Sequence, residues 1–265
     1  MDLELSGKAA IVTGGSRGIG KAVARELARE GVSVAIAARS REALEATAAE
    51  LAEETGSPVE PFVVDTTDER AVRAMVEGAM AAFSRVDILV NCAAPVGSSV
   101  AFRLPDVTED AFRGQLDVKV LGYLRCIQAV APHMIRAGWG RIINVSGLNA
   151  RNSTSIIGSV RNVAVVALTK NAADELGPHG INVTVVHPGL TVTEHYLVEV
   201  DAQAATEGVG RAEILQRRFA RNSLRRVLDA RDIANVVTFL ASPKSVAING
   251  DVIAAGGGVP GTIYY

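Results

Sequence analysis

The stretch that decides the fold is Ile11-Val12-Thr13-Gly14-Gly15-Ser16-Arg17-Gly18-Ile19-Gly20. It joins the apolar run 9–12 to apolar residues at Ile19, Val23 and Leu27, a spacing typical of an amphipathic helix. Glycines at such a junction let the backbone turn sharply, approach a pyrophosphate and pack helix on strand, while the free N–H groups of the helix start bind phosphates. The stretch therefore predicts a dinucleotide site formed by Gly14, Ser16, Arg17, Gly18, Ile19 and Gly20.

Further apolar runs rich in Val and Ile alternate with helical patterns along the rest of the chain. They are Val32–Ala37, Val59–Val64, Ile88–Val90, Ile142–Val145, Val183–Val186 and Val252–Ala254. Because alternating strands and helices require right-handed crossovers, they form a parallel sheet with helices on both faces. We expect one α/β domain over residues 1–265, a Rossmann-type doubly wound parallel sheet of about seven strands.

Local signals predict several helix ends. Gly31 is expected to end the first helix, and Ser40 to cap a helix that ends near Gly56. Thr66 and Glu69 have the spacing of a capping box.

One stretch, residues 190–222, breaks the alternation of strand and helix. It is expected to cover the ligand crevice.

Composition narrows the possible partners and compartment. A net charge of -2 gives no general electrostatic reason to expect nucleic acid or an anionic membrane as partner. The first residues lack the pattern of a secretory signal, and no apolar run is long enough to span a membrane. The two cysteines and four histidines lack the spacing of a disulfide framework or a metal site. We expect a cytoplasmic protein with reduced thiols and no metal.

The end of the second predicted strand bears on the choice of dinucleotide. An acidic residue there would accept hydrogen bonds from the adenosine ribose of NAD(H), but the chain has Ala37-Ala38-Arg39-Ser40. The guanidinium of Arg39 matches a 2′-phosphate, with Arg17 able to close from the other side. In the alternative interpretation, both arginines are only solvated charges at the protein surface. The pattern favours NADP(H) over NAD(H).

These residues carry a family resemblance over nearly the whole chain. The glycine motif, with the later segments Asn91-Cys92-Ala93-Ala94, Pro188-Gly189-Leu190-Thr191-Val192-Thr193 and Asn249-Gly250-Asp251, resembles the classical short-chain dehydrogenase/reductase family. The resemblance implies a nicotinamide cofactor, a homodimer or homotetramer, and further cofactor-binding residues at Asp65, Asn91, Ala93, Pro188, Gly189, Thr191 and Thr193.

The catalytic positions depart from the family pattern. Members of that family use a tyrosine as acid/base, a lysine one helical turn later, a serine and an asparagine. Here no tyrosine is followed by lysine four positions on, and none lies between Tyr123 and Tyr196. Alignment on Leu168-Thr169-Lys170 places Gly158 at the tyrosine position and Asn162 at the lysine position.

Two other catalytic positions are altered as well. Gly147 takes the place of the family serine, and Ser146, one residue earlier, either faces the site or only bonds to the loop. Lys119 replaces the asparagine. It either restores the lost positive charge from another helix or only seals a helix bend. The candidate catalytic residues are therefore Lys119, Ser146 and Asn162.

Three functions are compatible with this pattern. The first is an NADP(H)-dependent oxidoreductase of a carbonyl or alcohol, with its proton from Lys119, Ser146, His195 or Tyr196. The second is a binding or regulatory protein that kept the nucleotide pocket without turnover, and the third is a lyase or isomerase that uses the old pocket. Arg151 and Arg161 either bind an anionic small-molecule substrate or lie at the surface or in a subunit contact. The residues do not identify the substrate.

Overall fold

The computed structural model describes residues 1–94, 104–153, 155–260 and 263. They form a seven-stranded sheet of order β3-β2-β1-β4-β5-β6-β7, with every pair of neighbours parallel. The strands are β1 Ala9–Thr13, β2 Ser33–Ala38, β3 Val59–Val63, β4 Ile88–Asn91, β5 Gly140–Val145, β6 Ile181–Pro188 and β7 Val252–Ala255. All seven predicted strands are confirmed.

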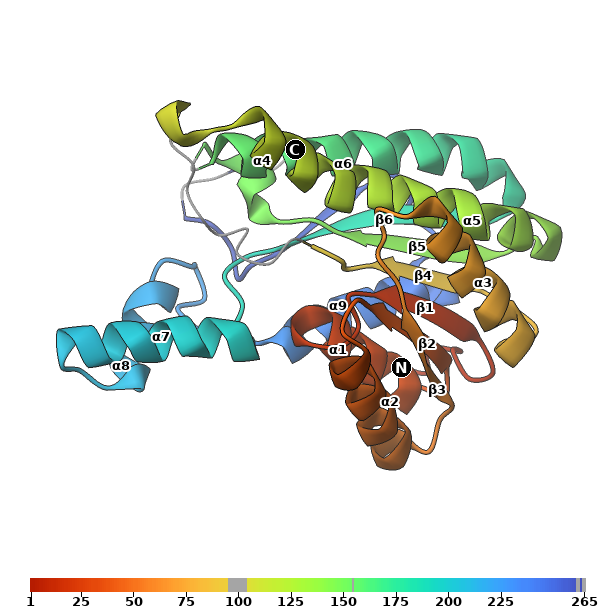
Figure 1. Ribbon diagram of the computed structural model, residues 1–265, viewed down its shortest axis with the longest axis horizontal. Helices are drawn as coiled ribbons and strands as arrows, with labels where there is room; N and C mark the ends of the chain where they lie inside the picture. The colour runs from red at the N-terminus through yellow and green to blue at the C-terminus, as the bar shows by residue number, and fades with distance from the viewer. Residues whose placement is uncertain (95–103, 154, 261–262, 264–265) are drawn as a thin grey trace.

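Helices cover both faces of this sheet (Figure 1). One face packs against α1 Gly18–Arg29, α2 Arg41–Thr55 and α9 Ala230–Ala241. The other packs against α3 Glu69–Phe83, α5 Gly122–Ala137 and α6 Ile156–Leu176. Because both faces of the central strands are covered, these strands are largely apolar, as in β1, whose five residues are all buried.

The strand order reverses between β1 and β4, which are neighbours although two strands separate them in the sequence. In an open sheet of this kind, ligands bind beyond the carboxyl ends of the strands at that point. The glycine loop follows β1 and the segment 92–94 follows β4. The fold therefore brings the predicted cofactor residues of both segments to one edge.

The helix ends show where local signals succeeded. Gly56 ends α2 with a φ of 72°, and Gly31 follows the C-cap of α1 with a φ of 77°. Ser40 is the N-cap of α2, but its side chain makes no capping hydrogen bond. The capping box at 66–69 is wrong: Asp68 is the N-cap of α3, and its carboxylate accepts from the N–H groups of residues 70 and 71. A carboxylate one residue before the first helical position captures these N–H groups directly.

The stretch 190–222 holds two successive helices, α7 Glu194–Glu207 and α8 Arg211–Phe219, with no strand between them. They lie side by side beyond the carboxyl end of β6 (Figure 1). Val200, Ala204 and Ile214 form a small apolar core of their own. The interruption in the alternation is confirmed, while its role as a cover over the crevice stays a prediction.

Two negative findings apply to the part of the chain that the structure describes. No helix there combines the length and the apolar character needed to cross a membrane. No group of three or more His, Cys, Asp or Glu side chains there gathers closely enough to hold a metal ion. The segment 95–103, which follows the predicted cofactor residues Asn91 and Ala93, lies outside the described residues, as do Tyr264 and Tyr265.

Candidate functional site

The glycine loop is shaped by close backbone approaches. A Cβ on Gly14, whose φ is 70°, would lie 3.0 Å from backbone atoms of Cys92 and Ala93. A Cβ on Gly20 would lie 2.2 Å from the carbonyl oxygen of Gly14. Glycine is required at both positions because no side chain fits there. The loop is thereby held tightly between α1 and the segment that follows β4.

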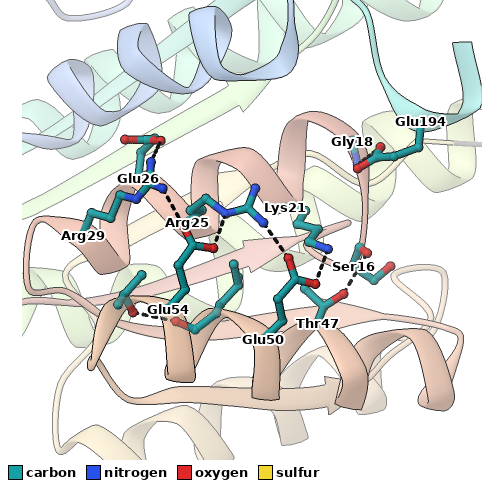
Figure 2. Close-up of polar contacts among 12 residues, drawn as sticks. Ser16, Gly18, Lys21, Arg25, Glu26, Arg29, Thr47, Glu50, Glu54 and Glu194 are labelled. Atoms are coloured by element: carbon teal, nitrogen blue, oxygen red, sulfur yellow. Dashed lines mark hydrogen bonds and ion pairs between the residues drawn. The ribbon is translucent and has the colours of Figure 1, made fainter. Parts of the chain in front are cut away.

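The start of α1 has no local side-chain cap for its N–H groups. Its N-cap residue, Arg17, makes no side-chain capping hydrogen bond, and the first turn contains no acidic residue. The Ser16 carbonyl accepts from the Thr47 hydroxyl at 3.0 Å, which fixes the loop to α2 (Figure 2). The Gly18 N–H donates to the carboxylate of Glu194 at 3.0 Å. A helix start of this kind binds anions.

The loop after β4 is tied to β1 by a hydroxyl. Thr13 Oγ1 accepts from the N–H groups of Cys92 and Ala93 at 3.2 and 3.3 Å. The Asn91 amide donates to Asn144 Oδ1 at 2.9 Å, while Asn91 Oδ1 is buried without a partner among the described residues. The structure thus places Asn91 and Ala93 beside the end of β1, next to the glycine loop, and their predicted contact with a cofactor stays a prediction.

The predicted adenosine end is polar and open. Arg17 and Arg39 are exposed, and neither makes an ion pair with a described residue. Asp65 Oδ1 accepts from the N–H and the hydroxyl of Thr67 at 3.0 and 2.9 Å. The backbone hydrogen bond of Thr67 holds the pKa of Asp65 below its ordinary value, and the nearby charge of Arg39 adds to this effect. Arg39 and Asp65 therefore share one neighbourhood.

The segment after β6 also lies at the carboxyl edge of the sheet. A Cβ on Gly189 would lie 2.7 Å from the Cα of Gly256, so this residue permits close backbone contact beside buried Pro188. Thr191 Oγ1 donates to the Gly189 carbonyl at 3.0 Å. Thr193 caps α7 by accepting from the Tyr196 N–H at 3.3 Å.

Lys119 is buried on a π-helical turn, Asp117–Leu121, between α4 Glu109–Leu116 and α5. Its Nζ donates to the Ser146 carbonyl, just beyond the carboxyl end of β5, at 2.9 Å. Burial, together with the charge of Arg161, lowers the pKa of Lys119 to about 7. Near neutral pH the amine is therefore able both to release and to accept a proton.

Ser146 and Asn162 lie beside this amine but use their polar groups differently. The Ser146 hydroxyl donates to the main-chain carbonyl of Asn162 at 3.3 Å. The side-chain Oδ1 of Asn162 is buried and has no hydrogen-bond partner in the described part of the chain. A Cβ on Gly147 would lie 3.1 Å from Asn162 Nδ2. All three candidate catalytic residues, Lys119, Ser146 and Asn162, therefore meet at the end of β5.

This cluster carries positive charge, and no acidic side chain among the described residues pairs with it. Arg161 is buried on α6 and donates to Gln115 Oε1, while its Nε finds no acceptor within the residues that the structure describes. Within the described ranges, neither Lys119 nor Arg161 forms an ion pair with a carboxylate. Because unpaired buried charges are costly, such a centre favours a group on which negative charge develops.

Other candidates from the sequence lie elsewhere or are inert. Tyr196 packs its ring edge-on against Phe219, with centroids 6.4 Å apart, between α7 and α8. His195 is exposed and lies 3.5 Å from Glu199. Burial raises the pKa of the Cys92 thiol to about 12, which keeps it protonated. In the part of the chain that the structure describes, none of these contacts joins Tyr196 or His195 to Lys119, whereas Cys92 lies close enough to Lys119 for the two groups to interact electrostatically.

His187 is a site neighbour that motif analysis missed. It is 1% exposed on β6, and its Nδ1 accepts from the Gly147 N–H at 3.3 Å. Burial and the charges of Arg151 and Lys119 lower its pKa to about 4. A signal was present, because a histidine within a fully buried parallel strand needs a polar partner.

His187 predicts a pH effect on stability. Its pKa rises to the ordinary 6.5 on unfolding, so the unfolded chain binds more protons between pH about 6.5 and 4. The contribution of neutral His187 to the free energy of unfolding is therefore fully present above this pH window. It is lost as pH falls through the window, by about 3 kcal/mol in all. We expect a His187→Asn variant to show a flatter dependence of its free energy of unfolding, measured by urea titration. Parallel curves for both proteins would contradict this role.

The residues present fit a nicotinamide dinucleotide. The glycine cradle would be filled by any Cβ at Gly20, and the start of α1 presents N–H groups to a pyrophosphate. The unpartnered oxygens of Asn91 and Asn162 offer acceptors for hydroxyl groups. These features lie along one edge of the sheet, as an extended dinucleotide requires.

Comparison with known proteins agrees with this geometry. Residues 14–260 match the family model described as enoyl-(acyl carrier protein) reductase. The chain belongs to the short-chain dehydrogenase/reductase family. Among curated members, it is 34% identical over 252 residues to the short-chain reductase protein NovJ of Streptomyces niveus, covering 95% of this chain and 93% of that protein. It is also 34% identical to the 3-oxoacyl-[acyl-carrier-protein] reductase FabG of Staphylococcus aureus, covering 95% and 98%.

Two solved structures of dehydrogenases and reductases are similar over almost the full chain. The L-sorbose reductase of Gluconobacter frateurii, complexed with NADPH and L-sorbose, has a TM-score of 0.92 at 27% identity and covers 99% of this chain and 100% of its own. A xylitol dehydrogenase bound to NAD+ has a TM-score of 0.85 at 30% identity, covering 96% and 100%. These relatives support a nicotinamide cofactor and an oxidoreductase of this family.

Proposed function

We propose that this family member is an NADP(H)-dependent oxidoreductase acting on a carbonyl or alcohol through a rebuilt catalytic centre. The observation that carries the proposal is the buried amine of Lys119, held at the Ser146 carbonyl beside Asn162. If Asn162 stands at the family lysine position, Lys119 supplies the missing positive charge from another helix. The predicted role of Lys119 in restoring that charge thus gains a geometric basis.

In this proposal the residues of the site have different roles in the reaction. When bound, the nicotinamide supplies or accepts the hydride. Lys119 holds a proton at Nζ that it exchanges near pH 7, and its charge, with that of Arg161 behind it, stabilises negative charge on a substrate oxygen. Asn162 Oδ1, which has no partner among the described residues, would accept a ribose hydroxyl. The Ser146 hydroxyl positions the chain at Asn162 rather than a substrate.

A second candidate is a binding or regulatory protein that holds NADP(H) without turnover. The Ser146 hydroxyl favours it, because its hydrogen bond goes to the α6 backbone. Isothermal titration with NADPH and NADH, followed by a carbonyl panel that includes L-sorbose and a 3-oxoacyl thioester, separates the two. NADPH binding with turnover supports the oxidoreductase, and binding without turnover supports the second candidate. Binding of neither nucleotide would overturn both.

We also propose a homodimer or homotetramer. Three apolar side chains of α6, Ile156, Val160 and Val163, are exposed, the last by 50%. Such a stripe on a long helix is suited to packing against a second copy of the chain.

The preference for NADP(H) rests on Arg39. We expect Arg39→Asp to lower the affinity for NADPH relative to NADH by at least about tenfold, because the guanidinium is replaced by a carboxylate that repels a 2′-phosphate and accepts from a ribose diol. Titration calorimetry with both nucleotides measures the ratio. Arg113→Asp, an equal charge change on exposed α4, serves as control. An unaltered ratio in Arg39→Asp would remove this residue from cofactor selection.

A further inference from the structure

Glu194 makes an unusual long-range contact with the glycine loop. It is the first residue of α7, and its Oε2 accepts from the Gly18 N–H at 3.0 Å, across 176 positions of sequence. Figure 2 shows this carboxylate directed at the start of α1 from the chain segment above it. The segment after β6 is therefore attached to the glycine loop by a charged group.

The contact satisfies a need of α1 that its own sequence leaves open. The N-cap side chain makes no hydrogen bond, and no acidic residue lies in the first turn. The partial positive charge of a helix start attracts an anion, so the carboxylate of Glu194 is stabilised there. It takes the place that a local capping residue takes in α9, where Asp229 caps its own helix.

A dinucleotide bound on this loop needs the same position. Its pyrophosphate is negatively charged and is held by the N–H groups at the start of the helix. Because Gly18 lies at that start, its N–H cannot serve both anions, and the two would repel each other. We propose that Glu194 is a latch that occupies the pyrophosphate seat in the nucleotide-free protein and is displaced when the nucleotide binds. The inference rests on the proposed function, since it needs a nucleotide on this loop.

Displacement of Glu194 from the glycine loop would shift α7 and α8 together. Thr193 lies against the loop as well, since a Cβ on Gly18 would be 3.4 Å from its Cγ2. Just before it, the Val192 N–H donates to the Leu228 carbonyl at 2.8 Å and anchors the chain. The apolar core that α7 and α8 share joins them into one unit. Cofactor binding is thereby coupled to the position of this helical pair.

Removal of the carboxylate charge tests the latch. We expect Glu194→Gln to bind NADPH about twofold to fivefold more tightly than the native chain, which is the range expected for one exposed charge at a helix start. Glu199→Gln, the same change one turn further along α7, is the control and is expected to leave the affinity unchanged. Titration calorimetry gives the dissociation constants.

Hydrogen exchange supplies a second measurement. In the native chain, NADPH is expected to speed amide exchange in the first turn of α7, whereas the nucleotide-free Glu194→Gln protein exchanges fast from the start. Equal affinities and equal exchange in the two proteins, with NADPH binding intact, would overturn the latch alone. Absence of NADPH and NADH binding by both would overturn the proposed function and, with it, the exchange of anions.

Discussion

Lys119→Met is expected to reduce turnover by at least about a hundredfold, because a positioned acid/base group contributes that much or more. Methionine keeps the length of the side chain but lacks the proton and charge at Nζ. The fold and NADPH binding at the adenosine end are expected to persist, since Lys119 lies at the far end of the site, on the Ser146 carbonyl. Steady-state rates and titration calorimetry on one preparation measure both.

The matched control is Lys170→Met, which removes an exposed lysine of α6 that pairs with Asp174. Its turnover should equal that of the native chain. A native rate in Lys119→Met would exclude this amine from the mechanism, even if the nucleotide still binds.

Lys119→Met is also expected to change the way in which the free energy of unfolding depends on pH. The pKa of Lys119 is about 7 in the folded protein and returns to the ordinary 10.5 on unfolding, so the unfolded chain binds more protons between these values. Native stability therefore rises with pH across this window. Lys119→Met lacks the buried charge and is expected to be more stable at pH 7 by about 2 kcal/mol, an advantage that shrinks towards pH 10. Thermal unfolding of both proteins across this range measures the difference.

Gly20→Ala is expected to lower the free energy of unfolding by about 3 kcal/mol and to weaken NADPH binding by at least about tenfold. The new Cβ would lie 2.2 Å from the Gly14 carbonyl oxygen, which is backbone, so α1 and the loop must separate. The phosphate-binding N–H groups move with them. Urea unfolding and titration calorimetry measure the two losses.

Gly114→Ala is the control for this change. Gly114 also lies in a helix, α4, but a Cβ there meets no atom within 4 Å. Since alanine is the better helix former, this variant is expected to gain about 0.5 to 1 kcal/mol. If Gly20→Ala behaved like Gly114→Ala, the close packing of the loop would not be the reason for glycine at position 20.

Much of the molecule follows from the sequence alone. The seven strands were predicted because buried parallel strands are continuous apolar runs, and the glycine loop because its spacing follows a strand and opens a helix. Helix ends were predicted well where glycine sets them, as at Gly56, and wrongly at 66–69, where two polar residues compete to cap one helix. Short stretches of sequence therefore predict an element correctly where interactions between neighbouring residues determine its conformation.

Tertiary structure decided the chemistry of the site. Lys119 was a candidate from its position in a motif, but only the fold placed its amine beyond the end of β5, next to a second buried cation. His187 and Glu194 reach the site through contacts with Gly147 and Gly18, residues 40 and 176 positions away in the sequence. Burial and long-range contact set pKa values and hydrogen-bond partners, and neither is encoded in the spacing of neighbouring residues.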